Sequence, residues 1–396
     1  MRTVFCLLCF VLSTLMMTVS APAAGAGPGE TLSGEGGAGD AVSCVKDVVV
    51  NTEVEIGGQR VHSMVLTLSG SADDFPELAP EDFVMNGKAA NWNDPRLHDF
   101  TAAFSGTEFL DPEEDGSVKL CLHMTEFPVK YFFVQEFTVS CSRFPGLSFT
   151  NEQVSEVVTP VADAFSDGVF EGSEDAYHLF TPEEADGPVP VVVVFHGYGD
   201  TDNILTYRTS VEWAEPSEQA VRPCYVLSPV IEQYMSAPVR GRVYEEVHAL
   251  LEEMIAAGQV DGKRVYVTGN SFGGAATVEF LERWPDFSAA AIVMCPALQY
   301  VDSAAFKNLA AIRDIPVWFA HAKSDQTIPS STSTTAFEIL EKAGAKNNRL
   351  TIYSDEEMLA AGGDPSPDAT LSFHHVEIAV MPDAAVREWL FEQQRP

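Results

Sequence analysis

A serine flanked by glycines is the residue best suited to chemistry in this chain. Ser271 lies in Gly269-Asn270-Ser271-Phe272-Gly273, a Gly-x-Ser-x-Gly pattern. A β-branched run, Arg264–Thr268, precedes it, and a helix-forming segment, Ala275–Arg283, follows it. A serine on such a strand–turn–helix is pushed outward at the edge of a sheet, and small flanking residues let strand and helix approach each other. The pattern predicts that Ser271 is a nucleophile; the alternative is an ordinary serine in a glycine-rich turn.

A serine nucleophile needs a base, a carboxylate that orients the base, and donors for an oxyanion. Asp325 follows the apolar run Ile315–Ala322, so we expect it beyond the carboxyl end of a strand, where α/β sheets place working residues. The alternative is a turn or helix-entry aspartate. His374 and His375 come later, just before a final helix, Asp383–Gln393. Spacing alone does not choose between these two histidines as the base.

Two backbone N–H groups are candidates for the oxyanion donors. One belongs to Phe272, directly after the nucleophile, and the other to Tyr198, in the loop that follows the apolar run Val189–Phe195. The ring of Tyr198 could also line an acyl or aryl pocket. We expect His196 to brace this loop and His321, which lies on a strand, to be structural.

Strand-like and helix-like segments alternate from about residue 173 onward. The expected strands are Val189–Phe195, Cys224–Ser228, Arg264–Thr268, Ala289–Cys295, Val317–His321 and Leu350–Ser354. The expected helices are Glu245–Ala257, Ala275–Arg283, Ala336–Ala343 and Asp383–Gln393. Alternation of this kind predicts an α/β domain, taken as residues 161–396, with a mostly parallel sheet and helices on both faces.

Residues 44–160 show short strand-like runs separated by turn residues, with no convincing amphipathic helix. The runs are Val48–Ile56, Val61–Ser69, Ser117–His123 and Tyr131–Cys141. Short strands at this spacing predict a small all-β sandwich of immunoglobulin-like size ahead of the α/β domain.

The first 26 residues are typical of a secretory signal peptide: Arg2, an apolar run from Val4 to Val19, and then small residues. Residues 27–43 are rich in Gly and Ala and are expected to be a linker. We therefore expect a secreted protein; a retained N-terminal anchor is the alternative. No later segment is apolar enough to span a membrane, so no span is expected in the mature chain.

Composition excludes several kinds of partner. The net charge of −35 and the lack of a basic patch exclude nucleic acid as a partner. No spacing of Cys and His suggests a metal site, and no cofactor is expected. Cys44, Cys121 and Cys141 leave room for one disulfide in an exported protein, but the pairing and the oligomeric state stay open.

Several stretches resemble secreted α/β-hydrolases of the esterase and polyhydroxybutyrate-depolymerase-like group. The matching stretches are Tyr177–Pro182, Val192–Gly199, Trp213–Ala220, Pro223–Pro229, Val265–Pro285 and Ile315–Pro329. They match the group or its subgroup that has an immunoglobulin-like domain ahead of the hydrolase. The resemblance implies an α/β-hydrolase fold and a triad of Ser271, Asp325 and a late histidine. Aligning the tail on Ile378, Val380 and Glu388–Phe391 favours His374 over His375. The chain departs from the group at Phe373, where glycine is usual, and at Val230, where glutamine is frequent.

These observations together predict a secreted serine carboxylesterase. It would act through an acyl-enzyme on a small-molecule or polymeric ester. The alternatives are a serine peptidase of the same fold, a polyester or feruloyl-type esterase, and, from another class, a non-catalytic binding protein that keeps a hydrolase fold.

Overall fold

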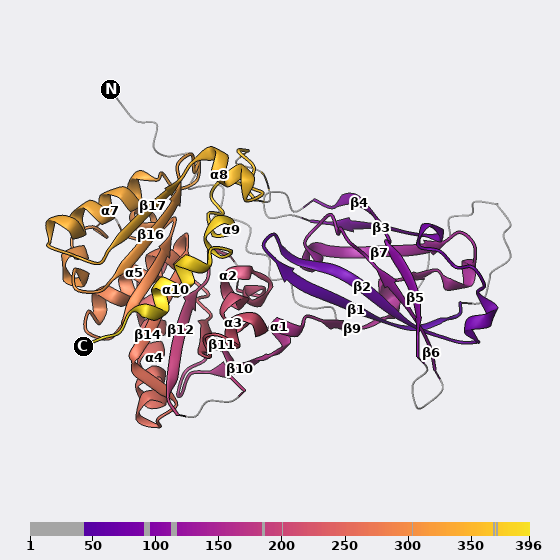
Figure 1. Ribbon diagram of the computed structural model, residues 1–396, viewed down its shortest axis with the longest axis horizontal. Helices are drawn as coiled ribbons and strands as arrows, with labels where there is room; N and C mark the ends of the chain where they lie inside the picture. Colours follow the sequence, from indigo (N-terminus) through magenta and orange to yellow (C-terminus); the bar gives the residue numbers. More distant parts are fainter. Residues whose placement is uncertain are drawn as a thin grey trace. The chain divides into compact units, whose positions relative to one another are not determined.

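The computed structural model describes residues 43–90, 96–111, 117–183, 187–199, 201–302, 304–366, 369 and 371–396. Figure 1 follows the chain through these elements. The predicted signal peptide and all of the predicted linker except Ser43 lie outside the described residues.

Residues 45–158 are rich in β-structure, as predicted. One sheet has five strands in the order β5-β6-β2-β1-β9, and another has four in the order β4-β3-β7-β8. The strands are β1 (Val45–Glu55), β2 (Gly58–Leu68), β3 (Phe83–Ala89), β4 (His98–Ala103), β5 (Gly106–Leu110), β6 (Val118–His123), β7 (Val134–Cys141), β8 (Phe149–Thr150) and β9 (Val154–Val158). Residues from both sheets, among them Met64, Leu66, Met85 and Val139, share one apolar core. Pairing of two such sheets buries the alternate residues of each strand.

The sequence indicated four of these strands and missed the others. Strands β1, β2, β6 and β7 overlap the four predicted runs, although Tyr131–Phe133 forms a 3-10 turn rather than the start of β7. The strand β3 carries Asn86-Gly87-Lys88, residues with low strand propensity. Its pairing with β4 and β7 on both sides overrides that local preference.

An eight-stranded sheet forms the centre of the α/β region, in the order β10-β11-β13-β12-β14-β15-β16-β17. Its strands are β10 (Phe165–Val169), β11 (Ala176–Phe180), β12 (Val189–Phe195), β13 (Tyr225–Pro229), β14 (Val260–Asn270), β15 (Ala290–Met294), β16 (Val317–Ala322) and β17 (Arg349–Tyr353). The strands from β12 to β17 are parallel, and β11 runs antiparallel to both of its neighbours. The predicted mostly parallel sheet is confirmed.

Helices cover both faces of this sheet (Figure 1). They are α1 (Pro160–Asp163), α2 (Arg208–Val211), α3 (Pro216–Gln219), α4 (Ala237–Ala256), α5 (Phe272–Arg283), α6 (Leu298–Val301), α7 (Ser331–Lys342), α8 (Asp355–Ala360), α9 (Glu377–Val380) and α10 (Ala384–Glu392). The strand β12 is a continuous apolar run because the side chains on both of its faces are buried. Val191 and Val193 pack into the core under α4, α5 and α7, whereas Val192 and Val194 pack into the core under α10.

The sheet begins earlier than the sequence indicated, at β10 rather than after residue 173. Gly168 on β10 explains how β10 and β11 fit together, because a Cβ there would lie 2.2 Å from the ring of Tyr177 on β11. Among the residues that the structure describes, no helix has the length and apolar composition needed to cross a membrane.

Candidate active site

Ser271 lies at the turn between β14 and α5 in a strained backbone conformation. Its φ is 56° and its ψ is −117°, a region that side-chain-bearing residues rarely occupy. The turn is held by backbone hydrogen bonds: the N–H of Ser271 donates to the carbonyl of Met294 at 3.0 Å, and the N–H of Ala297 donates to the carbonyl of Ser271 at 2.9 Å. The end of strand β15 and the loop after it thereby fix the backbone of the serine.

Glycines allow the close approach of strand and helix at this turn. A Cβ on Gly273 would lie 2.0 Å from the carbonyl oxygen of Phe195, and a Cβ on Gly269 would lie 2.5 Å from the backbone of Gly273. Real side chains do not tolerate such distances, so both positions require glycine. The Gly-x-Ser-x-Gly pattern therefore has the packing reason that the sequence suggested.

The structure places His374, and not His375, beside Ser271. The Nε2 atom of His374 lies 2.9 Å from the Oγ atom of Ser271, and its Nδ1 atom lies 2.8 Å from Oδ2 of Asp325. A carboxylate only accepts hydrogen bonds, so Nδ1 carries the proton and Nε2 of the neutral ring faces the serine as an acceptor. This arrangement can take a proton from the serine hydroxyl.

Asp325 is held as a carboxylate by several donors. Its Oδ1 atom accepts the N–H groups of Thr327 at 2.8 Å and Ile328 at 2.9 Å, and its Oδ2 atom faces His374 and His321. Burial by itself would raise the pKa of Asp325, but the hydrogen bonds from His321, His374 and the backbone outweigh it and hold the pKa well below its usual range. Asp325 therefore stays charged throughout the neutral range.

His321 has a contact that the sequence did not indicate. It is fully buried on β16, and its Nε2 atom lies 3.2 Å from Oδ2 of Asp325 and 3.0 Å from the carbonyl oxygen of Ile328. Both of these partners are acceptors, so Nε2 carries the proton. The residue is structural, as expected, and what it supports is the loop that carries Asp325.

His375 pairs with a different carboxylate. Its Nδ1 atom lies 2.8 Å from Oε1 of Glu377, which is buried at the start of α9. Burial opposes ionisation of Glu377, but the charge of His375 and its hydrogen bond outweigh that effect, so the pKa of Glu377 lies below its ordinary value. The adjacent histidines thus belong to two separate histidine–carboxylate pairs.

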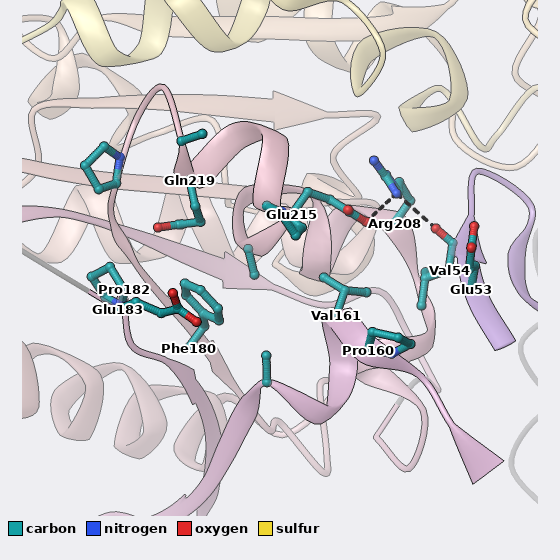
Figure 2. A pocket seen from close by; sticks show the side chains of 15 residues that line it. Glu53, Val54, Pro160, Val161, Phe180, Pro182, Glu183, Arg208, Glu215 and Gln219 are labelled. Atoms are coloured by element: carbon teal, nitrogen blue, oxygen red, sulfur yellow. Dashed lines mark hydrogen bonds and ion pairs between the residues drawn. The ribbon is translucent and has the colours of Figure 1, made fainter. Parts of the chain in front are cut away.

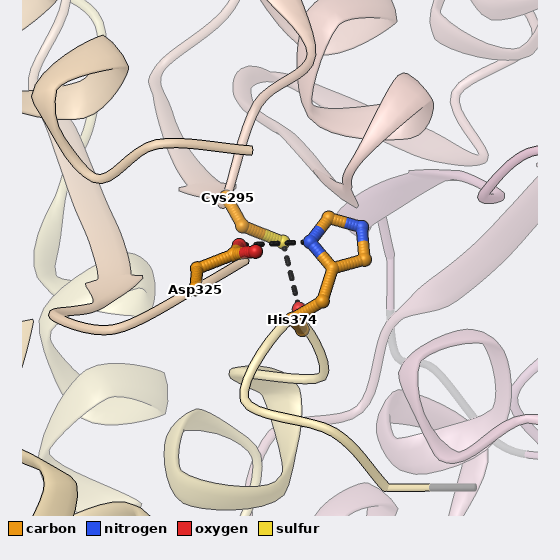
Figure 3. Close-up of side chains that lie close together, drawn as sticks. All are labelled: Cys295, Asp325 and His374. Carbon is orange, nitrogen blue, oxygen red and sulfur yellow. Dashed lines mark hydrogen bonds and ion pairs between the residues drawn. The ribbon is translucent and has the colours of Figure 1, made fainter. Parts of the chain in front are cut away.

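Cys295 packs directly against the histidine loop (Figure 3). Its buried Sγ–H donates to the carbonyl oxygen of His374 at 3.2 Å. Burial raises the pKa of this thiol well above its usual value, and the charges of Asp325 and Glu377 add to the effect, so it stays protonated and able to donate. Nothing in the sequence near Cys295 signals this role, because its partner lies far along the chain.

Cys295, Asp325 and His374 also form the one cluster of three side chains, within the described part of the chain, whose atoms could bind a metal ion. Their candidate ligand atoms lie within 4.8 Å of one another. The Nδ1 atom of His374 and Oδ2 of Asp325 already bind each other, and the thiol binds a carbonyl. These contacts fix the position of His374, and each of the three side chains already has a partner within the protein.

The candidate oxyanion donors lie at the two loops next to Ser271. Phe272 is the first residue of α5, and the first N–H groups of a helix have no partner within the helix. Tyr198 lies in the loop after β12. His196 braces that loop: its Nδ1 atom donates to the carbonyl of Gly197 at 2.7 Å, and its Nε2 atom accepts the N–H of Ile231 at 3.0 Å. Burial lowers the pKa of His196 to about 4, which keeps it neutral and able to accept.

A separate cavity of about 840 Å³ is lined by none of these site residues. Figure 2 shows its lining, which includes Phe180, Val161 and Arg208. The guanidinium of Arg208 donates to the carbonyl oxygen of Val54 at 3.1 Å and pairs with Glu215 at 2.6 Å. This cation is therefore already paired with groups of the protein.

Comparison with known proteins supports the fold. A family model described as phospholipase/carboxylesterase matches residues 240–358. No curated protein sequence matches the chain.

Solved structures of esterases are similar to this one. The crystal structure of a thermostable esterase is 24% identical, covers 89% of this chain and 100% of its own, and has a TM-score of 0.66. Est1E from Butyrivibrio proteoclasticus is 15% identical, covers 58% of this chain and 98% of its own, with a TM-score of 0.42. Thermogutta terrifontis esterase 2 is 15% identical, covers 48% of this chain and 83% of its own, with a TM-score of 0.39. The first of these likenesses shows that the chain shares the fold of that protein.

Proposed function

We propose that this protein is a serine carboxylesterase with Ser271 as nucleophile, His374 as base and Asp325 as the residue that orients the base. The observation that carries the proposal is the hydrogen-bonded series from Ser271 through His374 to Asp325, at 2.9 Å and 2.8 Å. The strained conformation of Ser271 supports it, because strain of this kind is retained at functional turns. The family model and the esterase fold support the ester as substrate.

The chemistry follows from these positions. The Oγ atom of Ser271 attacks the ester carbonyl carbon while Nε2 of His374 takes the hydroxyl proton, and the charge of Asp325 stabilises the resulting imidazolium. The backbone N–H groups of Phe272 and Tyr198 hold the oxyanion. His374 then gives its proton to the leaving alcohol, and a water molecule activated by the same histidine releases the acid. No cofactor takes part in this sequence.

The other predictions for the chain are part of the same proposal. Residues 1–26 are the signal peptide of a secreted enzyme, and residues 27–43 link it to an immunoglobulin-like domain of residues 44–160. The catalytic domain is residues 161–396. Among the described residues, Cys121, Cys141, Cys224 and Cys295 form no disulfide in this structure, and a disulfide within the β-rich region is not part of the proposal.

The test is turnover of p-nitrophenyl acetate and of the matching acetyl anilide by the wild-type chain and by Ser271→Ala. We expect the wild type to hydrolyse the ester much faster than the anilide, and the variant to lose at least about four orders of magnitude in kcat. Circular dichroism of the variant serves as the control for folding. Preferred cleavage of the anilide would indicate a peptidase, and no turnover of either compound would leave a non-catalytic binding protein.

A further inference from the structure

Two aromatic residues flank the nucleophile at the positions that carry the candidate oxyanion donors. The ring of Tyr198 lies 5.1 Å from that of Phe272, inclined by 41°. The ring of Phe272 lies 5.7 Å from that of Tyr234, edge to face, and Tyr234 lies 5.0 Å from the ring of His196. We call these residues, Tyr198, Phe272, Tyr234 and His196, the aromatic column.

The column runs from the surface into the interior. Tyr234 and His196 are each 2% exposed, and the hydroxyl of Tyr234 donates to the carbonyl oxygen of His196 at 2.6 Å. Tyr198 is 46% exposed at the other end. The ring of Tyr198 packs against that of Phe272, and nearly half of the surface of Tyr198 remains accessible to another molecule. A single exposed aromatic residue needs no explanation, but one that packs on Phe272, the residue after Ser271, with the buried ring of Tyr234 behind it, is suited to binding.

We propose that Tyr198 and Phe272 form the acyl-binding surface and that the preferred substrates are esters of acids that carry a planar aromatic ring. This inference rests on the proposed esterase function. The ester carbonyl oxygen must reach the N–H groups of residues 198 and 272. Both groups bonded to that carbonyl carbon, the acyl chain and the alcohol oxygen, start close to these two residues, and the proposal assigns the acyl chain to their side chains. A flat ring can stack on Tyr198, whereas a saturated ring of the same carbon number cannot.

Tyr300 provides a matched comparison near the loop that carries Asp325. It is 48% exposed, and its hydroxyl donates to the carbonyl oxygen of Thr327, in the loop that carries Asp325. Tyr300 thus has the residue type and exposure of Tyr198, without a position next to a candidate oxyanion donor.

The experiment uses the full chain and three esters with the same p-nitrophenol leaving group: the acetate, the 3-phenylpropanoate and the 3-cyclohexylpropanoate. kcat/KM is measured for the wild type, Tyr198→Leu, Tyr198→Phe and Tyr300→Leu. We expect the wild type to prefer the phenyl ester to the cyclohexyl ester. Tyr198→Leu should lower that ratio about 2- to 12-fold, the range measured for aromatic pairs. Tyr198→Phe should retain the ratio, and Tyr300→Leu should leave it unchanged.

The outcomes separate this inference from the proposed function. Turnover of the acetate without any preference for the phenyl ester would overturn the aromatic acyl site and leave the esterase standing. A ratio that falls in Tyr300→Leu but not in Tyr198→Leu would also overturn it, by placing the acyl group at the loop that carries Asp325. No turnover of any of the three esters would overturn the proposed function itself.

Discussion

The β-rich region of residues 45–158 and the α/β region of residues 165–392 differ in what they bury. Both have well-packed apolar cores. Among the described residues, however, the buried carboxylates all belong to the α/β region: Glu212, Glu218, Asp325 and Glu377. A buried carboxylate is costly unless it is paired and hydrogen-bonded, so the α/β region carries a cost that the β-rich region, where the buried charged residue is Lys130, does not share.

The two regions also differ in where their strained backbone conformations lie. Three described residues other than glycine have positive φ: Glu77, Ser271 and Cys295. Glu77 lies on an exposed loop of the β-rich region, whereas Ser271 and Cys295 are buried at the ends of the neighbouring strands β14 and β15. Strain on a loop can relax, but buried strain persists only where the surrounding packing enforces it. The carboxyl ends of the strands around Ser271 are therefore held under constraint, as expected of a catalytic centre.

We expect the largest effect on kcat to be the difference between substituting His374 and substituting His375. His374→Ala removes the ring that contacts Ser271 and is expected to lower kcat by about three orders of magnitude or more. His375→Ala breaks the pair with Glu377 and the edge-to-face contact with the ring of His374 but leaves the contact between His374 and Ser271, and should cost about tenfold at most. Steady-state kinetics on p-nitrophenyl acetate measures both. If the two losses are reversed, His375 is the base and the arrangement described above is wrong.

One glycine from each region provides a matched pair of substitutions. Gly273→Ala places a methyl group 2.0 Å from the carbonyl oxygen of Phe195, so the turn must open. We expect a loss of about 3 kcal/mol in the free energy of unfolding. Gly106→Ala on β5 places a methyl group 3.4 Å from the ring of His123, an ordinary contact, and should change the free energy by about 0.5 kcal/mol or less.

Urea unfolding followed by circular dichroism measures both glycine variants. Equal stability of the two variants would show that the turn at Ser271 is not under the constraint that its geometry indicates.

Substitutions at two buried cysteines test whether the thiol of Cys295 contributes to kcat. Cys295→Ala removes the hydrogen bond to the carbonyl of His374 and should lower kcat about 2- to 10-fold, the worth of one such bond. Cys295→Ser keeps a donor and should recover part of the loss. Cys121→Ala, on β6 of the β-rich region, should leave kcat unchanged. A Cys295→Ala enzyme as active as the wild type would mean that the thiol only fills space.

The smallest effect concerns pH. Burial, followed by the charges of Glu279 and Asp302, raises the pKa of Glu282 on α5 from 4.5 to about 7. Between these values the folded state binds more protons than the unfolded state, so stability falls as the pH rises. Glu282→Gln removes that loss and should be more stable than the wild type at pH 8, but not at pH 4, by on the order of 1 kcal/mol after allowing for the partial exposure of the group.

A matched charge-removing variant, Glu156→Gln, lies on the exposed surface of β9. It should show the same pH dependence of the unfolding midpoint as the wild type. An identical pH dependence in Glu282→Gln would show that this carboxyl group is solvated in the folded protein.

The sequence predicted what depends on local pattern. The bounds of β12 are those expected from its apolar run, and the glycines around Ser271 mark a turn that only glycine permits. It did not predict contacts between distant segments. The hydrogen bond from Cys295 to His374 joins residues 79 apart in the chain. The missed strands β3 to β5 depend likewise on their pairing partners rather than on their own propensity.

The spacing of residues in the sequence also could not decide between His374 and His375 as the base. Adjacent residues share their sequence context, so only the direction of each side chain in the folded loop distinguishes them. The structure directs His374 to Ser271 and His375 to Glu377. Resemblance to a family favoured the same histidine, whereas spacing could not.

The most direct measurement is the site of covalent labelling by a fluorophosphonate probe. The full chain and Ser271→Ala are treated with the probe, their masses are measured intact, and the adduct is located by peptide mapping. We expect one adduct on the wild type, on the peptide that contains Ser271, and none on the variant, whose circular dichroism should match that of the wild type. An adduct on a folded Ser271→Ala protein, or on a different serine of the wild type, would contradict the assignment of Ser271 as the nucleophile.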